Sequence, residues 1–230
     1  MALLKLEHIS YGYNDGNKKR MILEDLDYEF DRGIFYSVLG PSGSGKTTLL
    51  AVAGGLERSQ AGTVFFDGVN INDIGLGNYR KNKLSFVFQQ FNLINYLTAA
   101  ENVVNVMEIT GNKVPKPYYT TALNLLDQFG IVKTKAERNV LQLSGGEQQR
   151  VAIARSLATN VDLILADEPT GNIDTATEKE IIKIFRRLAD EYNKCIIVVT
   201  HSEEVSKLSH VLLDLKDGRL IERSNRKDGE

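Results

Sequence analysis

The chain has 230 residues, of which 42% are hydrophobic and 25% are charged, and its formal net charge is −2. A chain of this length can bury a full apolar core, so the fold needs no disulfide or metal to hold it together. The small net charge excludes a strong basic field for a nucleic-acid backbone, and we expect no nucleic-acid partner. The one cysteine, Cys195, cannot form an internal disulfide, which is typical of a reducing compartment.

The beginning of the chain has no targeting pattern. Residues Met1–Lys5 lead directly into a charged, alternating strand, which is unlike a signal peptide. No apolar stretch approaches the roughly 20 residues that span a bilayer. We therefore expect a cytoplasmic protein that acts at a membrane only through a partner.

Short β-prone runs alternate with helix-length segments along the chain. This order predicts an α/β fold with a mainly parallel central sheet. Residues 34–39, 163–166 and 196–200 are apolar on both faces, as strands covered by helices are. Two Asp-Gly pairs, at positions 67–68 and 217–218, lie between β-prone runs and predict hairpin turns, and so an antiparallel part.

A helical lobe is predicted within this core. Residues 92–155 have few β-branched runs and a helical rhythm. The chain is then one domain over 1–230, with a core lobe at about 1–91 and 156–223 and a polar, frayed tail at 224–230.

A clear amphipathic helix is predicted before the last apolar strand. Thr175 and Glu178 have the spacing of a capping box and would open this helix. Asn193 would end it in a left-handed conformation.

The segment from residue 40 to 47 matches the P-loop pattern G-x-x-x-x-G-K-[ST] between a predicted strand and a helix. Its glycines let successive N–H groups point at phosphate oxygens, and the helix N-terminus adds about half a positive charge. Lys46 can reach the β- and γ-phosphates, and the Thr47 hydroxyl can ligate Mg²⁺. We therefore expect ATP to be bound by Gly40, Pro41, Ser42, Gly43, Ser44, Gly45, Lys46, Thr47 and Thr48.

Two acidic residues follow the predicted strand 163–166. Asp167 would emerge at the carboxyl end of this strand and hold Mg²⁺. The side chain of Glu168 would point in the opposite direction to that of Asp167, and it is placed to polarise an attacking water. The alternative is a solvated strand end before a turn at Pro169.

A second helix start that can bind phosphate lies at Leu143–Gln149, with the sequence LSGGEQQ. Ser144 and Glu147 have capping-box spacing, and the glycines leave N–H groups free at the helix N-terminus. The segment resembles the signature sequence of ABC (ATP-binding cassette) ATPases. In that family this surface docks on the nucleotide held by the other subunit's P-loop, which implies a homodimer formed on ATP binding. The corresponding nucleotide-binding residues are Ser144, Gly145, Gly146 and Glu147, the last at a position where many members have glutamine.

The resemblance covers nearly the whole chain and implies further roles. Gln89 is similar to the Q-loop glutamine, which touches metal or water and links the core to the helical lobe. Gly171–Asp174 is similar to the D-loop, which packs across the dimer and brings Asp174 to the nucleotide. His201 is similar to the switch histidine, which contacts the γ-phosphate.

The resemblance also implies an aromatic platform for adenine. Tyr13 is the residue at this place, and Tyr11 is the alternative. The implied activity is ATP hydrolysis. Its catalytic residues would be Glu168, His201 and Gln89, and its Mg²⁺ ligands Thr47, Gln89 and Asp167.

Two segments indicate a particular bacterial group within the family. Ala166–Asp174 and Leu97–Val103 are similar to ATPases of macrolide-export, lipoprotein-release and antimicrobial-peptide-resistance systems. The likeness implies a membrane permease with a large extracytoplasmic domain, a secreted adaptor in some systems, and a peripheral location on the inner face of the membrane. Phe91–Leu97 is apolar for a loop and predicts contact with a short cytoplasmic helix of the permease. The alternative for this segment is packing inside the helical lobe.

Two other functions are alternatives to export. A non-transport ATPase that regulates cell-wall hydrolysis or division through a permease-like partner would share the same chemistry. A DNA-repair or chromosome-organising ATPase would need a long coiled coil between Lys46 and Leu143, and no sustained heptads occur there.

Overall fold

A six-stranded sheet forms the centre of the protein, whose computed structural model describes residues 2–15, 18–171 and 173–223. The strand order is β10-β9-β3-β8-β7-β6, and all neighbours pair in parallel except β9 and β10, which are antiparallel. The predicted α/β fold with a mainly parallel sheet is confirmed, while the predicted tail at 224–230 lies outside the described residues. The strands are β3 (Phe35–Leu39), β6 (Leu84–Phe88), β7 (Leu163–Asp167), β8 (Cys195–Val199), β9 (Val211–Lys216) and β10 (Arg219–Glu222).

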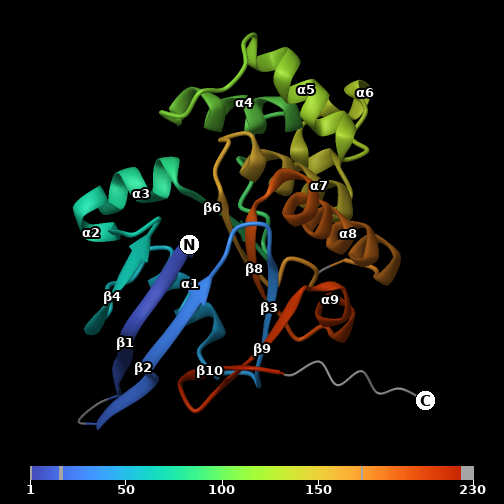
Figure 1. Ribbon diagram of the computed structural model, residues 1–230. Coiled ribbons are helices and arrows are strands. Elements are labelled where there is room, and N and C mark those ends of the chain that lie inside the picture. The colour runs from blue at the N-terminus through green and yellow to red at the C-terminus, as the bar shows by residue number, and fades with distance from the viewer. Residues whose placement is uncertain (1, 16–17, 172, 224–230) are drawn as a thin grey trace.

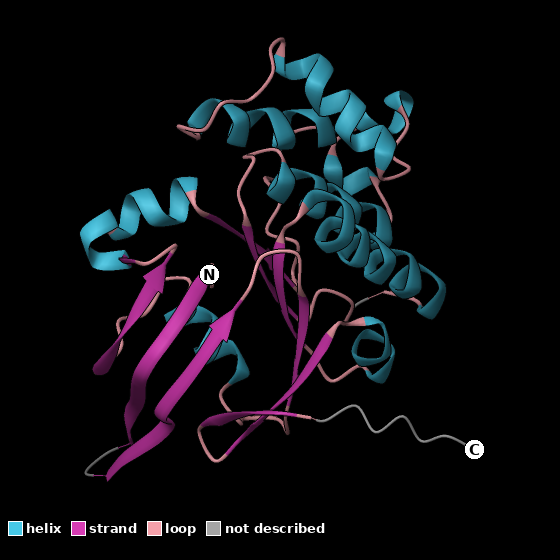
Figure 2. Cartoon of the chain, viewed as in Figure 1, coloured by secondary structure: helices cyan, strands magenta, loops and turns pink. Residues whose placement is uncertain are grey.

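A second, antiparallel sheet lies beside the first, in the order β2-β1-β4-β5. Figure 2 shows its strands to the left of the central sheet, with helix α1 between the two. The side chains of α1 pack into one apolar core with residues of both sheets. These elements are β1 (Leu4–Asp15), β2 (Lys18–Phe30), β4 (Ala61–Phe66), β5 (Val69–Asn70) and α1 (Lys46–Ala53).

Both predicted Asp-Gly turns join antiparallel strands. Asp67 and Gly68 connect β4 to β5, and Asp217 and Gly218 connect β9 to β10. All four residues have positive φ, from 50° at Asp217 to 78° at Gly68. Two consecutive residues of this kind give the twist that a two-residue hairpin needs, which explains the Asp-Gly pairs.

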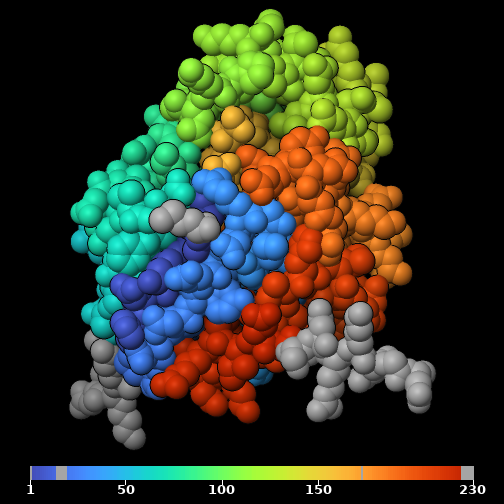
Figure 3. Space-filling model, in the orientation of Figure 1, coloured from blue at the N-terminus to red at the C-terminus, as the bar shows by residue number. Residues whose placement is uncertain are grey.

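Helices between β6 and β7 form the upper part of the molecule (Figure 1, green to yellow). Figure 3 shows the green residues at the top of the molecule, above the blue and red residues. The predicted division into lobes stays a prediction, and its boundary at residue 155 falls inside α7. The helices are α4 (Ala99–Ile109), α5 (Tyr118–Gln128), α6 (Lys133–Ala136), η1 (Val140–Gln142) and α7 (Gly145–Leu157).

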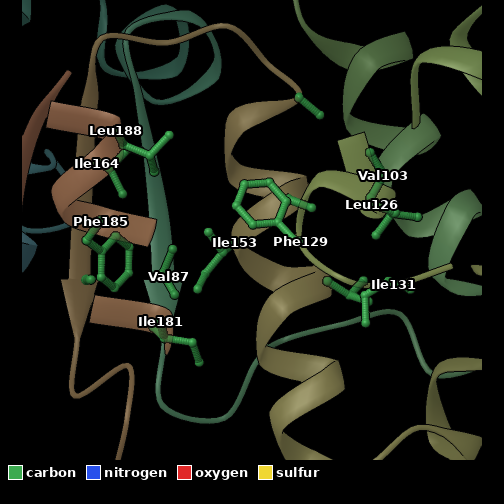
Figure 4. Close-up of a cluster of buried hydrophobic side chains, with 14 of the residues drawn as sticks. Val87, Val103, Leu126, Phe129, Ile131, Ile153, Ile164, Ile181, Phe185 and Leu188 are labelled. Atoms are coloured by element: carbon green, nitrogen blue, oxygen red, sulfur yellow. The ribbon is translucent and has the colours of Figure 1, made fainter. Parts of the chain in front are cut away.

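The helical part and the central sheet share one apolar core (Figure 4). Ile153 of α7 lies in this core with Val87 of β6 and Phe185 of α8. Helix α7 is therefore packed against the same sheet that carries the P-loop. Within the described ranges, no helix is both long and apolar enough to cross a bilayer. The remaining helices are α2 (Ile71–Ile74), α3 (Leu76–Asn82), α8 (Thr175–Tyr192) and α9 (Glu203–Leu208).

The caps of α8 differ from the prediction at one end. Asp174, and not Thr175, is the N-cap, because its carboxylate accepts hydrogen bonds from the N–H groups of Ala176 and Thr177. At the other end Asn193 has φ 53° and ends the helix in the left-handed conformation, as predicted.

Candidate functional site

The loop from residue 40 to 45 connects the carboxyl end of β3 to the first turn of α1. Gly45 is the N-cap of α1 and has φ 100°, which strains any residue with a side chain. A Cβ at this position would also overlap the side chain of Ile22 on β2. Gly43 has φ 76°. Glycine is therefore required at these two positions for the loop to curl in front of the helix N-terminus.

The Lys46 side chain folds back over this loop. Its Nζ donates hydrogen bonds to the carbonyl oxygens of Gly40 at 2.8 Å and Pro41 at 3.2 Å, and lies 3.2 Å from Nε2 of His201. The residue is only 7% exposed. Burial lowers the pKa of Lys46, and the charges of Glu168 and Asp167 oppose that effect. The ammonium group thus lies at the centre of the loop, where its positive charge can attract an anion.

Asp167 and Thr47 face each other across the site. The Thr47 hydroxyl donates to Oδ1 of Asp167 at 3.3 Å. Burial raises the pKa of Asp167, although this hydrogen bond and the charge of Lys46 act in the opposite direction. A hydroxyl and a carboxylate oxygen side by side are hard ligands, so the two residues fit a Mg²⁺ ion bound between protein and phosphate.

Glu168 is held at the end of β7 in a strained conformation. Its φ is 45°, a left-handed value that costs a non-glycine residue about 1–3 kcal/mol. Its Oε2 accepts a hydrogen bond from the backbone N–H of His201, and its Oε1 lies 3.3 Å from Nε2 of the same residue. A backbone bond from Glu168 N–H to Val199 O, at 2.9 Å, ties the turn to β8. The carboxylate and the imidazole are therefore placed as a pair beside Lys46.

The two candidate tyrosines differ in exposure. Tyr13 is 49% exposed, and its hydroxyl lies 3.4 Å from the Thr48 hydroxyl. Tyr11 is 8% exposed, donates to Glu57 at 3.0 Å, and packs edge-on against Tyr13. Burial, followed by the contact with Glu57, raises the pKa of Tyr11 to about 12. The geometry favours Tyr13 as the adenine platform, because only its ring has a face open beside the P-loop.

Replacing Tyr13 with leucine is expected to weaken ATP binding by about 1–2 kcal/mol, the usual worth of stacking a base on an aromatic ring. The phosphate contacts remain, so binding should still be measurable by calorimetric titration. Tyr11→Leu is the matched variant, and it should leave the affinity within about twofold once folding is verified. Loss of affinity in Tyr11→Leu together with normal affinity in Tyr13→Leu would reverse the assignment.

These side chains line one cleft of about 610 Å³. Arg20 and Ile22 on β2 belong to it, although the sequence analysis did not single them out. Arg20 is the cross-strand partner of Tyr13, and Ile22 lies two residues further on the same face. Only the pairing of β1 with β2 reveals this. The lining residues are Tyr13, Arg20, Ile22, Ser42, Gly43, Gly45, Lys46, Thr47, Thr48, Asp167, Glu168 and His201.

Three predicted P-loop residues line neighbouring cavities instead. Gly40 and Pro41 lie at the edge of a cavity of about 760 Å³ that reaches α9, and Ser44 lies on the other side of the loop. The Ser44 hydroxyl is buried and has no hydrogen-bond partner among the described residues. It is a donor that a phosphate oxygen could satisfy.

The signature residues lie outside this cleft. Ser144 is the N-cap of α7 and forms the predicted capping box with Glu147, while Gly145 and Gly146 begin the helix. Lys135 is 2.5 Å from Glu147, and this hydrogen bond is the main reason why the pKa of Glu147 is lowered. Among the described residues that line the cleft, none comes from the signature segment.

Gln89 and Asp174 are also outside the lining of the cleft. Gln89 directly follows β6, and its amide is close to Gly171, where an added Cβ would be 2.9 Å from Nε2. The Asp174 carboxylate is occupied in capping α8 and also accepts from the Thr177 hydroxyl at 2.7 Å. Asn172, in the predicted D-loop, lies outside the described residues. The roles of these residues stay predictions.

Residues 23–171 match a protein-family model described as ABC transporter. The chain is 44% identical over 225 residues to the uncharacterized ABC transporter ATP-binding protein YclH of Bacillus subtilis, and the alignment covers 98% of both. It is 40% identical over 218 residues to the lipoprotein-releasing system ATP-binding protein LolD of Rickettsia bellii, covering 95% of this chain and 97% of LolD.

A solved structure is also similar to this chain. It is the dimer of the ATP-binding cassette MJ0796 of Methanocaldococcus jannaschii in a post-hydrolysis state, bound to ADP and Pi. The TM-score is 0.86 at 38% identity, and the match covers 96% of this chain and 97% of the other. The family match includes the P-loop, Gln89, the signature segment and Glu168, and it ends before His201.

Proposed function

Because this chain belongs to the ABC transporter family of ATP-binding proteins, we propose that it is the ATP-hydrolysing subunit of an export or mechanotransmission system. It dimerises on ATP and drives a separate membrane permease. ATP is its substrate and Mg²⁺ its cofactor. The observation that carries the proposal is the single cleft in which Lys46, Asp167, Glu168 and His201 converge beside Tyr13.

Each residue of the cleft has a distinct task in hydrolysis. Lys46 and the loop N–H groups hold the phosphates, since the lysine can exchange the two carbonyls it now contacts for phosphate oxygens. Glu168 orients the attacking water and draws its proton, and His201 stands at the γ-phosphate end of the cleft. Thr47 and Asp167 would hold Mg²⁺, which when bound offsets the charge on the phosphates.

A second copy of the chain completes the site. The P-loop, an acidic pair and a histidine line the cleft. None of the described residues that line it belongs to α7, so its outer side has no phosphate donor from that helix. The capping box at Ser144 presents such a donor set elsewhere on the surface. The dimeric state of the solved archaeal cassette supports the same arrangement for two copies of this chain.

The permease is proposed to dock on the helical side of the protein. In Phe91–Leu97, only Tyr96 is largely exposed among the apolar residues, at 83%. A mainly apolar groove of about 410 Å³ is formed by residues of α3, β6 and the end of α4, with Phe86 and Ile109 in its lining. Such a groove fits a short amphipathic helix.

The kind of system is inferred from a relative. The likeness to an ATP-binding protein of a lipoprotein-releasing system supports an export-type role. On this basis the protein acts at the inner face of the cell membrane through a permease that has an extracytoplasmic domain. A secreted adaptor belongs to the same proposal.

Mixing two inactive chains tests the shared site. Lys46→Ala breaks the P-loop of its own site, and Ser144→Arg places bulk where the serine must approach the partner's nucleotide. A heterodimer of the two has one site with both lesions and one with neither. Equal mixtures should therefore recover up to about a quarter of the wild-type ATPase activity per chain, if pairing is random and the sites fire independently.

The control is a mixture of Lys46→Ala with Glu168→Gln. Both residues line the same cleft, so every site in every dimer would carry a lesion and the mixture should stay inactive. Ser144 is exposed, so circular dichroism should show a folded Ser144→Arg chain. If the first mixture recovers no more activity than the control, each chain completes its own site and the proposed dimer mechanism is wrong.

A further inference from the structure

The N-terminus of α7, which is proposed to meet the triphosphate held by the partner subunit, carries a glutamate. Glu147 is the third residue of this helix. Its Oε2 accepts a hydrogen bond from the backbone N–H of Ser144 at 2.9 Å, which keeps the carboxylate beside the helix start. ATP is itself strongly negative, so an uncompensated carboxylate at this place would repel it.

The Glu147 carboxyl is held in its charged form. The hydrogen bond with Lys135 and that with the Ser144 N–H lower the pKa of Glu147, and burial opposes them. The positive end of the α7 dipole also favours a negative charge at this position. The charge is therefore present at neutral pH, and another group has to offset it before a second negative group can approach.

Lys135, on the short helix α6, supplies the opposite charge. Its Nζ lies 2.5 Å from Oε1 of Glu147, the oxygen that does not bond to the Ser144 N–H. Among the described residues, no other cation lies within ion-pair distance of Glu147, and no other carboxylate lies within that distance of Lys135. The two oxygens of the glutamate thus have separate partners, the capping backbone and one ammonium group.

The fold places α6 where this contact can form. Ala136, which follows Lys135, is fully buried in the same apolar core as Leu143, just before α7. The Lys135 side chain is 41% exposed and reaches the start of α7 from the rim of that core. Lys133, two residues earlier on α6, pairs with Glu137 instead. Of the two lysines on this helix, only Lys135 offsets a charge in the signature segment.

We propose that Lys135 is a positioning residue for dimer formation, which acts through Glu147 by holding and neutralising it at the surface that docks on the ATP of the partner subunit. Without Lys135, an uncompensated carboxylate faces the triphosphate. A symmetric dimer contains this contact twice, so one substitution removes the compensation at both sites. The inference rests on the proposed function, because it takes the ATP-bound dimer from it.

Dimer formation can be measured in chains that carry Glu168→Gln, which are expected to bind ATP without discharging it. Lys135→Met keeps the apolar stem of the side chain and removes its charge. With ATP and Mg²⁺, it should raise the chain concentration at which half of the chains are dimers by about tenfold or more, because like charges that face each other across an interface are strongly unfavourable. Analytical ultracentrifugation over a range of chain concentrations gives this value.

The affinity of the single chain for ATP should stay within about twofold in Lys135→Met, because Lys135 does not line the cleft of its own chain. Titration of a fluorescent ATP analogue, at chain concentrations where no dimer forms, measures this affinity. A weakened dimer together with an unchanged single-chain affinity assigns the effect of Lys135 to docking.

A double-mutant cycle with Glu147→Gln decides whether Lys135 acts through the charge of Glu147. In the Glu147→Gln background, Lys135→Met should shift the half-dimer concentration by less than about twofold, because no negative charge remains to be offset. Lys135→Arg keeps a cation in place and should restore dimer formation in the native background. If Lys135→Met weakens the dimer equally in both backgrounds, Lys135 only supports the fold and the proposal is wrong.

Lys133→Met is the matched control. It removes an equal charge from the same helix but leaves Glu147 paired, so the half-dimer concentration should stay within about twofold. A loss as large as that of Lys135→Met would show that general positive charge matters, and it would contradict the proposal. If Lys135→Met melts below the assay temperature, Lys135→Gln replaces it and should show the same defect, since a neutral donor does not offset the carboxylate.

Failure of the proposed function would look different. If Glu168→Gln with Lys135 intact forms no dimer on ATP, the proposed shared site is wrong, and the role of Lys135 falls with it. If that chain dimerises and Lys135→Met dimerises equally well, only the role of Lys135 is wrong. A Glu147→Gln chain that no longer dimerises would show that the carboxylate is itself needed for docking, which would also overturn the role of Lys135.

Discussion

Glu168→Gln is expected to slow ATP hydrolysis by about 10²–10⁴-fold while ATP still binds. Glutamine keeps the shape of the side chain but removes the negative charge that orients water and receives its proton. The phosphate contacts of Lys46 and of the loop N–H groups do not depend on this carboxylate. Steady-state phosphate release gives the rate, and calorimetric titration gives the affinity.

The same variant should trap the dimer. Two subunits that hold ATP and cannot hydrolyse it have no route back to monomers except ATP release, so dimers accumulate with ATP and Mg²⁺. Light scattering should then report twice the mass of the nucleotide-free chain. Glu180→Gln is a matched control, since Glu180 is exposed on α8 and pairs only with Arg150 among the described residues. Hydrolysis by Glu168→Gln at a near wild-type rate would show that another group activates the water.

Lys46→Ala is expected to weaken ATP binding by about 10²-fold or more, because a charge-assisted contact to concentrated phosphate charge is lost. The nucleotide-free chain should remain folded, with a melting temperature within a few degrees of wild type. The reason is that burial disfavours the charged lysine before ATP arrives, which limits what the lysine adds to stability.

Thermal melts measure both effects at once. In the wild-type chain, ATP should raise the melting temperature by an amount that grows with the logarithm of its concentration over Kd, and at the same ATP concentration this increase should be much smaller in Lys46→Ala. Lys133→Ala is the control, since Lys133 is exposed on α6 and pairs with Glu137. An unchanged ATP-dependent rise in Lys46→Ala would remove the lysine from the phosphate site.

Local rules made much of this fold predictable. The Asp-Gly turns, the end of α8 at Asn193 and the strand–loop–helix of the P-loop each depend on a few consecutive residues. The carboxyl ends of parallel strands meet at one edge, which is why Asp167 and the P-loop could be expected together.

Most of the features that were missed depend on tertiary contacts, and one is a local choice between two neighbouring capping residues. Thr175 has the spacing of a capping box, but Asp174 takes the cap because its carboxylate accepts from two N–H groups. Arg20 joins the cleft only through its pairing with Tyr13 on the neighbouring strand. Lys135 of α6 bonds to a side chain of α7, and no periodicity reveals such a contact.

The fold of Lys46 onto its own loop bears on what it costs this loop to bind an anion. Its ammonium is held by the carbonyl oxygens of Gly40 and Pro41, so the chain itself places a cation at the centre of the loop. Groups that the fold already holds in place lose little conformational freedom when a ligand binds, and little ordering then opposes binding.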